Sequence, residues 1–97
     1  MLYTETITSA ALEFLTILMQ DKALKTFILV GGTALTLQLD HRLSVDFDLF
    51  TDADFNAVEL AEYLQSEYGF KADYITKNTI KGVVNGIKLD CIAYKYP

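Results

Sequence analysis

The chain has 97 residues, and 52% of them are hydrophobic, which is enough for the core of one small domain and not for two. Its formal net charge of −5 at pH 7 argues against broad electrostatic binding of nucleic acid. A single cysteine excludes an intramolecular disulfide, and the chain shows neither a leader nor an apolar run of about 20 residues, so we expect a soluble, cytoplasmic protein.

The first predicted element is an amphipathic helix. Its apolar positions recur at three- and four-residue spacing on one face, with polar residues opposite. These positions are Ile7, Ala10, Ala11, Phe14, Leu15, Leu18 and Met19. We expect this helix to cover the core and to take no part in chemistry, because an apolar stripe of this kind usually only packs.

Two adjacent glycines, Gly31 and Gly32, follow a short apolar run. Residues 27–30 predict a central strand buried on both faces, and residues 33–39 predict a short helix that opens at the glycine turn. Free amide groups at the start of such a helix favour a phosphate. An ordinary tight turn is the alternative. The pattern lacks the lysine of a P-loop and the three spaced glycines of a dinucleotide site.

Residues 40–44 lead into an acidic strand. Arg42 and Ser44 stand just before that strand, where a guanidinium and a hydroxyl would meet phosphate oxygens. The alternative is a surface ion pair and a hydroxyl that stabilises a turn. We expect His41 to be a solvent-facing loop residue.

The acidic strand itself spans residues 44–50 and carries Asp46 and Asp48. Because side chains alternate along a strand, both carboxylates project to one face, and Val45, Phe47 and Leu49 project to the other. Two carboxylates on one face repel each other, and a hard cation such as Mg²⁺ relieves that repulsion. The strand therefore predicts a metal and phosphate site.

A second helix should follow, with caps offered by residues 51–54 and an end near Ser66. Gly69 is the expected glycine signal after its last turn. The apolar face that the spacing predicts consists of Phe55, Val58, Leu60, Ala61 and Leu64. Its acidic residues are interpreted as a solvated face.

The last third of the chain predicts three strands. Residues 70–76 alternate loosely, and residues 79–84 and 87–94 form a β-hairpin around an Asn85-Gly86 turn. Asp90 lies on the face of the last strand opposite Leu89 and Cys91. A carboxylate in an apolar strand needs a partner, which is either a lysine (Lys88 or Lys81) or a metal ion.

Taken together, the elements predict an α/β or α+β fold in which helices pack against a mixed β-sheet. We expect Asp46, Asp48 and Asp90 to meet at one edge of that sheet, facing the glycine turn. Three aspartates beside a glycine turn are the parts of a two-metal phosphoryl-transfer site. If Asp90 lay on the opposite face, the shared metal site would be lost.

These motifs resemble a known family. The order apolar-Gly-Gly, Asp-apolar-Asp and a third aspartate on a later strand is similar to the nucleotidyltransferase fold of the DNA polymerase beta superfamily. Residues 30–35 (Val-Gly-Gly-Thr-Ala-Leu) and 41–50 (His-Arg-Leu-Ser-Val-Asp-Phe-Asp-Leu-Phe) more closely resemble the AbiEii/AbiGii nucleotidyltransferase toxins of bacterial abortive-infection toxin-antitoxin pairs.

The resemblance implies an enzyme that moves a nucleoside monophosphate from a nucleoside triphosphate to an acceptor hydroxyl on RNA, protein or a small molecule. Gly31, Gly32 and Thr33 would cradle the triphosphate. Asp46 and Asp48 would hold Mg²⁺ or Mn²⁺, and Asp90 would complete the metal site and help to deprotonate the acceptor. A cognate antitoxin would be the protein partner, and no membrane would be involved.

Family members usually continue into a helical region that contributes a catalytic lysine. We therefore expect residues 1–97 to be the nucleotidyltransferase core of a longer protein, with weak or absent turnover alone and some self-association through uncovered apolar surface. Two other classes stay open: an inactive nucleotidyltransferase fold that binds a partner protein, and a structural domain with three coincidental aspartates.

Overall fold

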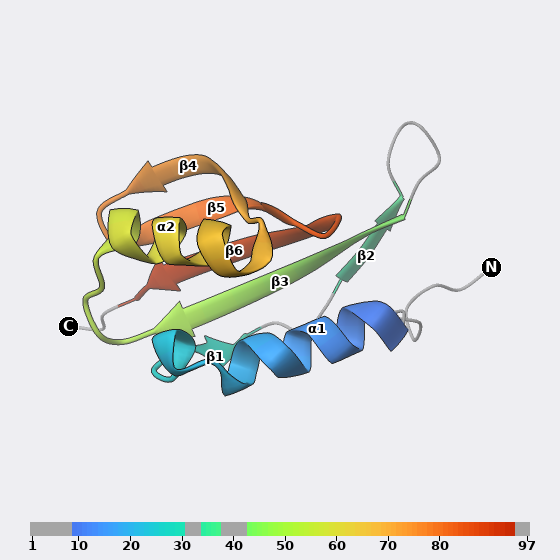
Figure 1. Cartoon of the computed structure of the whole chain (residues 1–97), viewed down its shortest axis with the longest axis horizontal. Coiled ribbons are helices and arrows are strands. Elements are labelled where there is room, and N and C mark those ends of the chain that lie inside the picture. The colour runs from blue at the N-terminus through green and yellow to red at the C-terminus, as the bar shows by residue number, and fades with distance from the viewer. Residues whose placement is uncertain (1–8, 31–33, 38–42, 95–97) are drawn as a thin grey trace.

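The computed structural model describes residues 9–30, 34–37 and 43–94 of the chain (Figure 1). Two α-helices, a short 3-10 helix (η1) and six β-strands occur in these segments. In chain order they are α1 (Ser9–Gln20), η1 (Lys22–Leu24), β1 (Ile28–Leu29), β2 (Ala34–Leu37), β3 (Leu43–Thr51), α2 (Ala57–Tyr68), β4 (Lys71–Thr76), β5 (Thr79–Val84) and β6 (Ile87–Ala93).

The strands form one mixed sheet in the order β1-β3-β6-β5-β4, and β2 also pairs with β3. β3 and β6 run parallel, whereas the other neighbouring strands run antiparallel. Helices are packed against this sheet (Figure 1), which confirms the predicted α+β fold.

Both helices cover the same face of the sheet (Figure 1). They contact each other where the aromatic ring of Phe14 on α1 packs edge-on against that of Tyr68 on α2, with 5.6 Å between the ring centroids. The strand residues beneath them include Phe47, Leu49, Leu89 and Cys91, all fully buried. These residues occupy alternate positions, as the periodicity predicts. The core is therefore one-sided, and we call the opposite face of the sheet the open face.

Two turns follow the predicted chemistry. Asn85 and Gly86 join β5 to β6 with φ angles of 53° and 76°, the left-handed conformation that a tight hairpin turn needs. Gly69 ends α2 at φ 80°, and its amide donates to the carbonyl of Gln65. Both predictions are confirmed.

The helix predicted over residues 33–39 is wrong for the described part of that range. Ala34–Leu37 form β2, which pairs antiparallel with the first half of β3. The physical reason is that β3 is nine residues long, and the hydrogen-bonding edge of its first half can take a further strand. Pairing satisfies the β2 backbone without a helix.

The prediction of a central, doubly buried strand over residues 27–30 is also wrong. β1 is a two-residue strand at the end of the sheet order, and Ile28 is 64% exposed. Among the described strands β1 pairs with β3 alone, and both of its residues are exposed. A short apolar run does not distinguish a central strand from a strand at the end of the sheet, because its sequence contains no information about the neighbouring strands.

The start of α2 differs as well. Its N-cap is Asn56, whose side chain accepts from the amide of Glu59 at 3.0 Å, and not a residue of 51–54. Thr51 still belongs to β3, and its hydroxyl accepts from the amide of Ala53 instead. The buried face of α2 consists of Ala57, Leu60, Ala61 and Leu64, so Val58, which was predicted on that face, turns to solvent and is 55% exposed.

Candidate active site

Three aspartates share the open face of the sheet. In the parallel ladder between β3 and β6, Asp48 stands opposite Asp90 and Asp46 stands opposite Lys88. Neighbouring residues of a ladder project to the same side, so Asp90 lies on the same face as Asp46 and Asp48. We call these three residues the aspartate row.

The aspartate row lies inside the sheet. The sequence analysis had placed these three residues at an edge of the sheet, and that expectation is wrong. β1 and β2 occupy the outer side of β3, and β6 is covered on its far side by β5. Each of the three side chains is half-buried. The carboxylates are therefore reached from the open face and not from the rim.

The surroundings of Asp90 oppose its ionisation. Partial burial raises the pKa of Asp90, the charges of Asp48 and Asp46 raise it further, and Lys81 and Lys88 lower it in part. Lys81 stands directly across from Asp90 on β5. The net effect is a raised pKa, so the charged form of Asp90 lacks full compensation and a nearby cation would stabilise it.

The donors of the row suit a hard cation. Carboxylate oxygens are the ligands of Mg²⁺ and Mn²⁺, and Mg²⁺ in phosphoryl-transfer sites commonly takes one or two carboxylates together with substrate phosphates and water. Within the described segments, no group of three His, Cys, Asp or Glu side chains is placed to hold a metal ion. The row therefore fits a shared site with substrate better than a cage made by protein alone.

The residues predicted to bind phosphate lie mostly outside the described residues: Gly31, Gly32, Thr33 and Arg42, as does His41. Ser44 belongs to β3, but its side chain is not among those described. The two ends of the glycine segment are nevertheless placed. Val30 donates its amide to the carbonyl of Asp48 at 2.9 Å, and Ala34 stands opposite Asp46. The segment thus leaves and rejoins the sheet beside the aspartate row.

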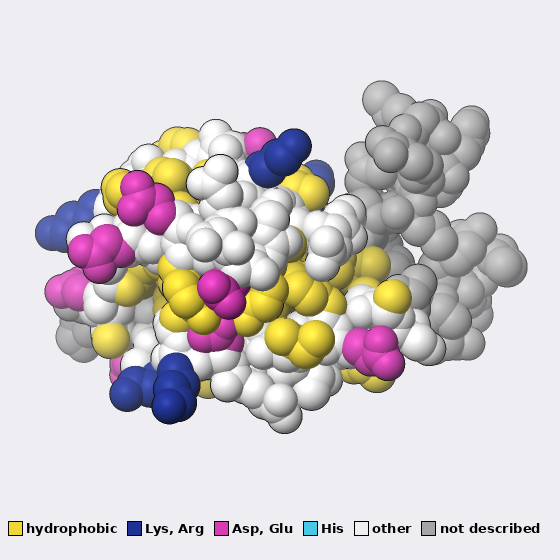
Figure 2. Space-filling view, in the orientation of Figure 1, with side chains coloured by type: hydrophobic (Ala, Val, Ile, Leu, Met, Phe, Trp, Pro, Cys, Tyr) yellow, Lys and Arg dark blue, Asp and Glu magenta, His cyan; other side chains and the backbone are white. Residues whose placement is uncertain are grey.

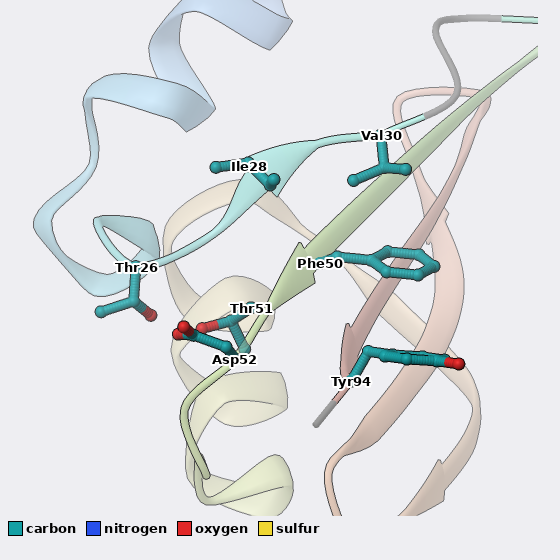
Figure 3. A pocket seen from close by; sticks show the side chains of 7 residues that line it. All are labelled: Thr26, Ile28, Val30, Phe50, Thr51, Asp52 and Tyr94. Atoms are coloured by element: carbon teal, nitrogen blue, oxygen red, sulfur yellow. The ribbon is translucent and has the colours of Figure 1, made fainter. Parts of the chain in front are cut away.

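A cavity of about 610 Å³ opens beside the row, and sequence reasoning missed it (Figure 3). Its lining comes from the turn before β1 and from the ends of β1, β3 and β6: Thr26, Ile28, Val30, Phe50, Thr51, Asp52 and Tyr94. The rings of Phe50 and Tyr94 stack with centroids 6.4 Å apart and an interplanar angle of 19°. The sequence did contain one signal for this cavity: side chains alternate along β3, so Phe50 lies on the same face as Asp48.

Other titratable groups serve the fold. Burial raises the pKa of the Cys91 thiol to about 12, so it is not a nucleophile at neutral pH. Asp21 accepts hydrogen bonds from the hydroxyls of Tyr63 (2.7 Å) and Tyr68, which connects η1 to α2. On the side covered by the helices, acidic and basic side chains are scattered among a band of apolar ones (Figure 2).

A mixed sheet with helices on one face and aspartates on the other is a nucleotidyltransferase-like fold. A family model described as "Nucleotidyl transferase AbiEii toxin, Type IV TA system" matches residues 13–97, and the chain belongs to that family. The resemblance seen in the sequence is thereby confirmed.

The chain is also similar to "Uncharacterized protein aq_aa25" of Aquifex aeolicus (strain VF5), with 34% identity over 73 residues. The aligned part covers 73% of this chain and 35% of that protein, so the chain spans about a third of the relative's length. No solved structure matches the chain. None of the helices in the described segments is long and apolar enough to cross a membrane.

Proposed function

We propose that the chain is the core of a metal-dependent nucleotidyltransferase. It would transfer a nucleoside monophosphate from a nucleoside triphosphate to an acceptor hydroxyl, and the whole protein would be the toxin paired with a cognate antitoxin. The observation that supports this best is the register of β3 and β6, which puts Asp48 beside Asp90 with Asp46 on the same face. The family of the chain supports the same activity.

Each residue of the row has a role in this proposal. Asp46 and Asp48 would hold Mg²⁺ or Mn²⁺ together with substrate phosphates and water, and Asp90 would complete the site beside them. When bound, the cation supplies Lewis acidity at the triphosphate and lowers the proton affinity of the acceptor hydroxyl. The Gly31-Gly32-Thr33 segment, together with Arg42 and Ser44, would orient the triphosphate.

The reaction is a displacement at the α-phosphorus. The acceptor oxygen forms a bond to phosphorus, the bond to the leaving oxygen breaks, and pyrophosphate leaves. Asp90 would accept the proton that the acceptor hydroxyl loses.

A second candidate is a catalytically inactive nucleotidyltransferase fold that binds a partner protein. One observation favours it: in the part of the chain that the structure describes, no three acidic, His or Cys side chains converge on a common metal position. The two candidates differ in whether the chain binds a metal with a nucleotide.

Isothermal titration of each nucleoside triphosphate with Mg²⁺ or Mn²⁺ separates them. We expect metal-dependent binding by the chain and its loss in a variant carrying Asp46→Asn and Asp48→Asn. Asp73→Asn is the matched control, because Asp73 is exposed on β4, away from the aspartate row. Absence of binding by the folded chain would contradict the transferase proposal and favour the partner-binding candidate.

A further inference from the structure

The cavity beside the aspartate row has no role in the function proposed so far. We infer that it binds the nucleobase of the nucleotide substrate, by stacking the base on the aromatic pair of Phe50 and Tyr94. This inference rests on the proposed function, because it assumes that the triphosphate end of the same ligand lies at the aspartate row.

The chemistry of the cavity suits a flat ring with polar edges. Ile28, Val30 and Phe50 give it an apolar wall, and its volume of about 610 Å³ lies within the range of small-molecule sites, about 300–1,000 Å³. Figure 3 shows the two aromatic rings one above the other on one side. The oxygen atoms of Thr26 and Asp52 lie at the other end (Figure 3), where they would meet the polar edge of a base.

The aromatic pair is accessible to a third ring. Phe50 and Tyr94 are nearly parallel, and the side chain of Tyr94 is 50% exposed. A nucleobase can stack on the exposed ring of such a pair as a third ring, because every nucleobase has a π face that stacks on an aromatic side chain. Stacking of this kind tolerates different bases, so it does not by itself select one.

The cavity lies next to the aspartate row along the open face, and its lining begins one step past Asp48 on β3. Phe50 follows Asp48 at the next position of β3 on the same face, about 7 Å along the strand. Tyr94 continues the line that Asp90 begins on β6, and its amide donates to the carbonyl of Thr51 at 2.8 Å. On β3 the carboxylate of Asp48 is followed on this face by Phe50, and on β6 Asp90 is followed by Ile92, which stands opposite Phe50. Tyr94 comes one step later, just past the end of β6. One ligand with an anionic end and a flat end fits this order.

An exposed apolar surface can also receive a segment of polypeptide. Two features favour a base. The surface here contains a stacked aromatic pair instead of a continuous aliphatic patch, and polar groups stand at its far end. It also adjoins a row of carboxylates, which would attract a cation that carries a triphosphate.

The test compares a nucleotide with its phosphate part alone. Nucleoside triphosphate and inorganic tripolyphosphate, each with Mg²⁺, are titrated into the chain and into the Tyr94→Ala and Phe50→Leu variants. We expect Tyr94→Ala to weaken nucleotide binding about tenfold or more and to leave tripolyphosphate binding unchanged. Tyr74→Ala is the matched control, since Tyr74 is 53% exposed on β4.

The outcomes separate this inference from the function on which it rests. If nucleotide binding depends on Asp46 and Asp48 but is unchanged in Tyr94→Ala and Phe50→Leu, the base pocket is wrong and the transferase proposal stands. Equal affinity of the chain for nucleotide and tripolyphosphate also overturns the pocket.

A third titration covers the case in which no phosphate ligand binds. Nucleosides are added at millimolar concentration while NMR follows the ring signals of Phe50 and Tyr94. Shifts confined to these rings would support the pocket although the transferase proposal had failed. Unshifted rings, with no nucleotide binding, would overturn the pocket as well and favour a polypeptide as its occupant.

Discussion

Replacing Asp90 with asparagine should stabilise the folded chain at pH 7, although under the proposed function it should remove nucleotide transfer by the whole protein. The carboxylate of Asp90 stands beside that of Asp48 and is partly removed from water, and both effects raise its pKa. An aspartate whose pKa is raised on folding contributes most to stability when it is protonated. Its contribution is lost as the pH rises above the folded pKa, so at pH 7 the charge is a cost.

The size of the effect follows from the strand spacing. Two unit charges about 5 Å apart repel by about 0.8 kcal/mol in water and about 3 kcal/mol at an effective dielectric constant of about 20. Both carboxylates are only half-buried, and Lys81 and Lys88 offset part of the repulsion. We therefore expect a gain of about 1 kcal/mol, which raises Tm by roughly 4–8 °C in a domain of this size.

Thermal unfolding followed by circular dichroism measures this gain directly. Asp90→Asn should raise Tm at pH 7, and the difference from the unmodified chain should shrink near pH 3, where Asp90 is protonated. Mg²⁺ should raise the Tm of the unmodified chain more than that of the variant, because it relieves the same repulsion. Asp73→Asn on exposed β4 should change Tm little. A lower Tm for Asp90→Asn at pH 7 would refute the reasoning and show that its attraction to the lysines dominates.

Three further predictions concern the fold. A Cβ added at Gly82 would clash with the backbone carbonyl of Lys71 on β4 and lie 2.5 Å from the ring of Phe70, so Gly82→Ala should cost about 1–3 kcal/mol in urea unfolding. An unchanged midpoint would show that both the β4 backbone and the ring give way freely. Burial raises the pKa of Asp21, but hydrogen bonds, from Tyr68 first, hold it below its usual value. The stability that Asp21 adds is therefore present above its ordinary pKa and lost as the pH falls through the lowered one. Tyr68→Phe should accordingly destabilise the chain more at pH 7 than near pH 2, and equal losses at both pH values would contradict this. Asn56→Ala should lower stability by about 1 kcal/mol through loss of the α2 cap, and Asn56→Asp should retain most of it.

The local features of the fold could be predicted from the sequence because neighbouring residues determine them. The alternation along β3 separates Asp46 and Asp48 from the buried Phe47 whatever the sheet looks like elsewhere. The Asn85-Gly86 turn specifies its hairpin because both residues tolerate positive φ. The apolar face of α1 likewise depends only on helical spacing.

The tertiary structure alone decided which strands are neighbours. Parallel pairing of β3 with β6 joins residues far apart in the chain, and it brings Asp90 level with Asp48. The edge position of β1 and the pairing of β2 depend on the free side of β3, which no local pattern contains. The cavity is the clearest case, because Ile28, Phe50 and Tyr94 come from separate parts of the chain. Side-chain periodicity identifies a face of a strand, and only packing determines which other faces adjoin it.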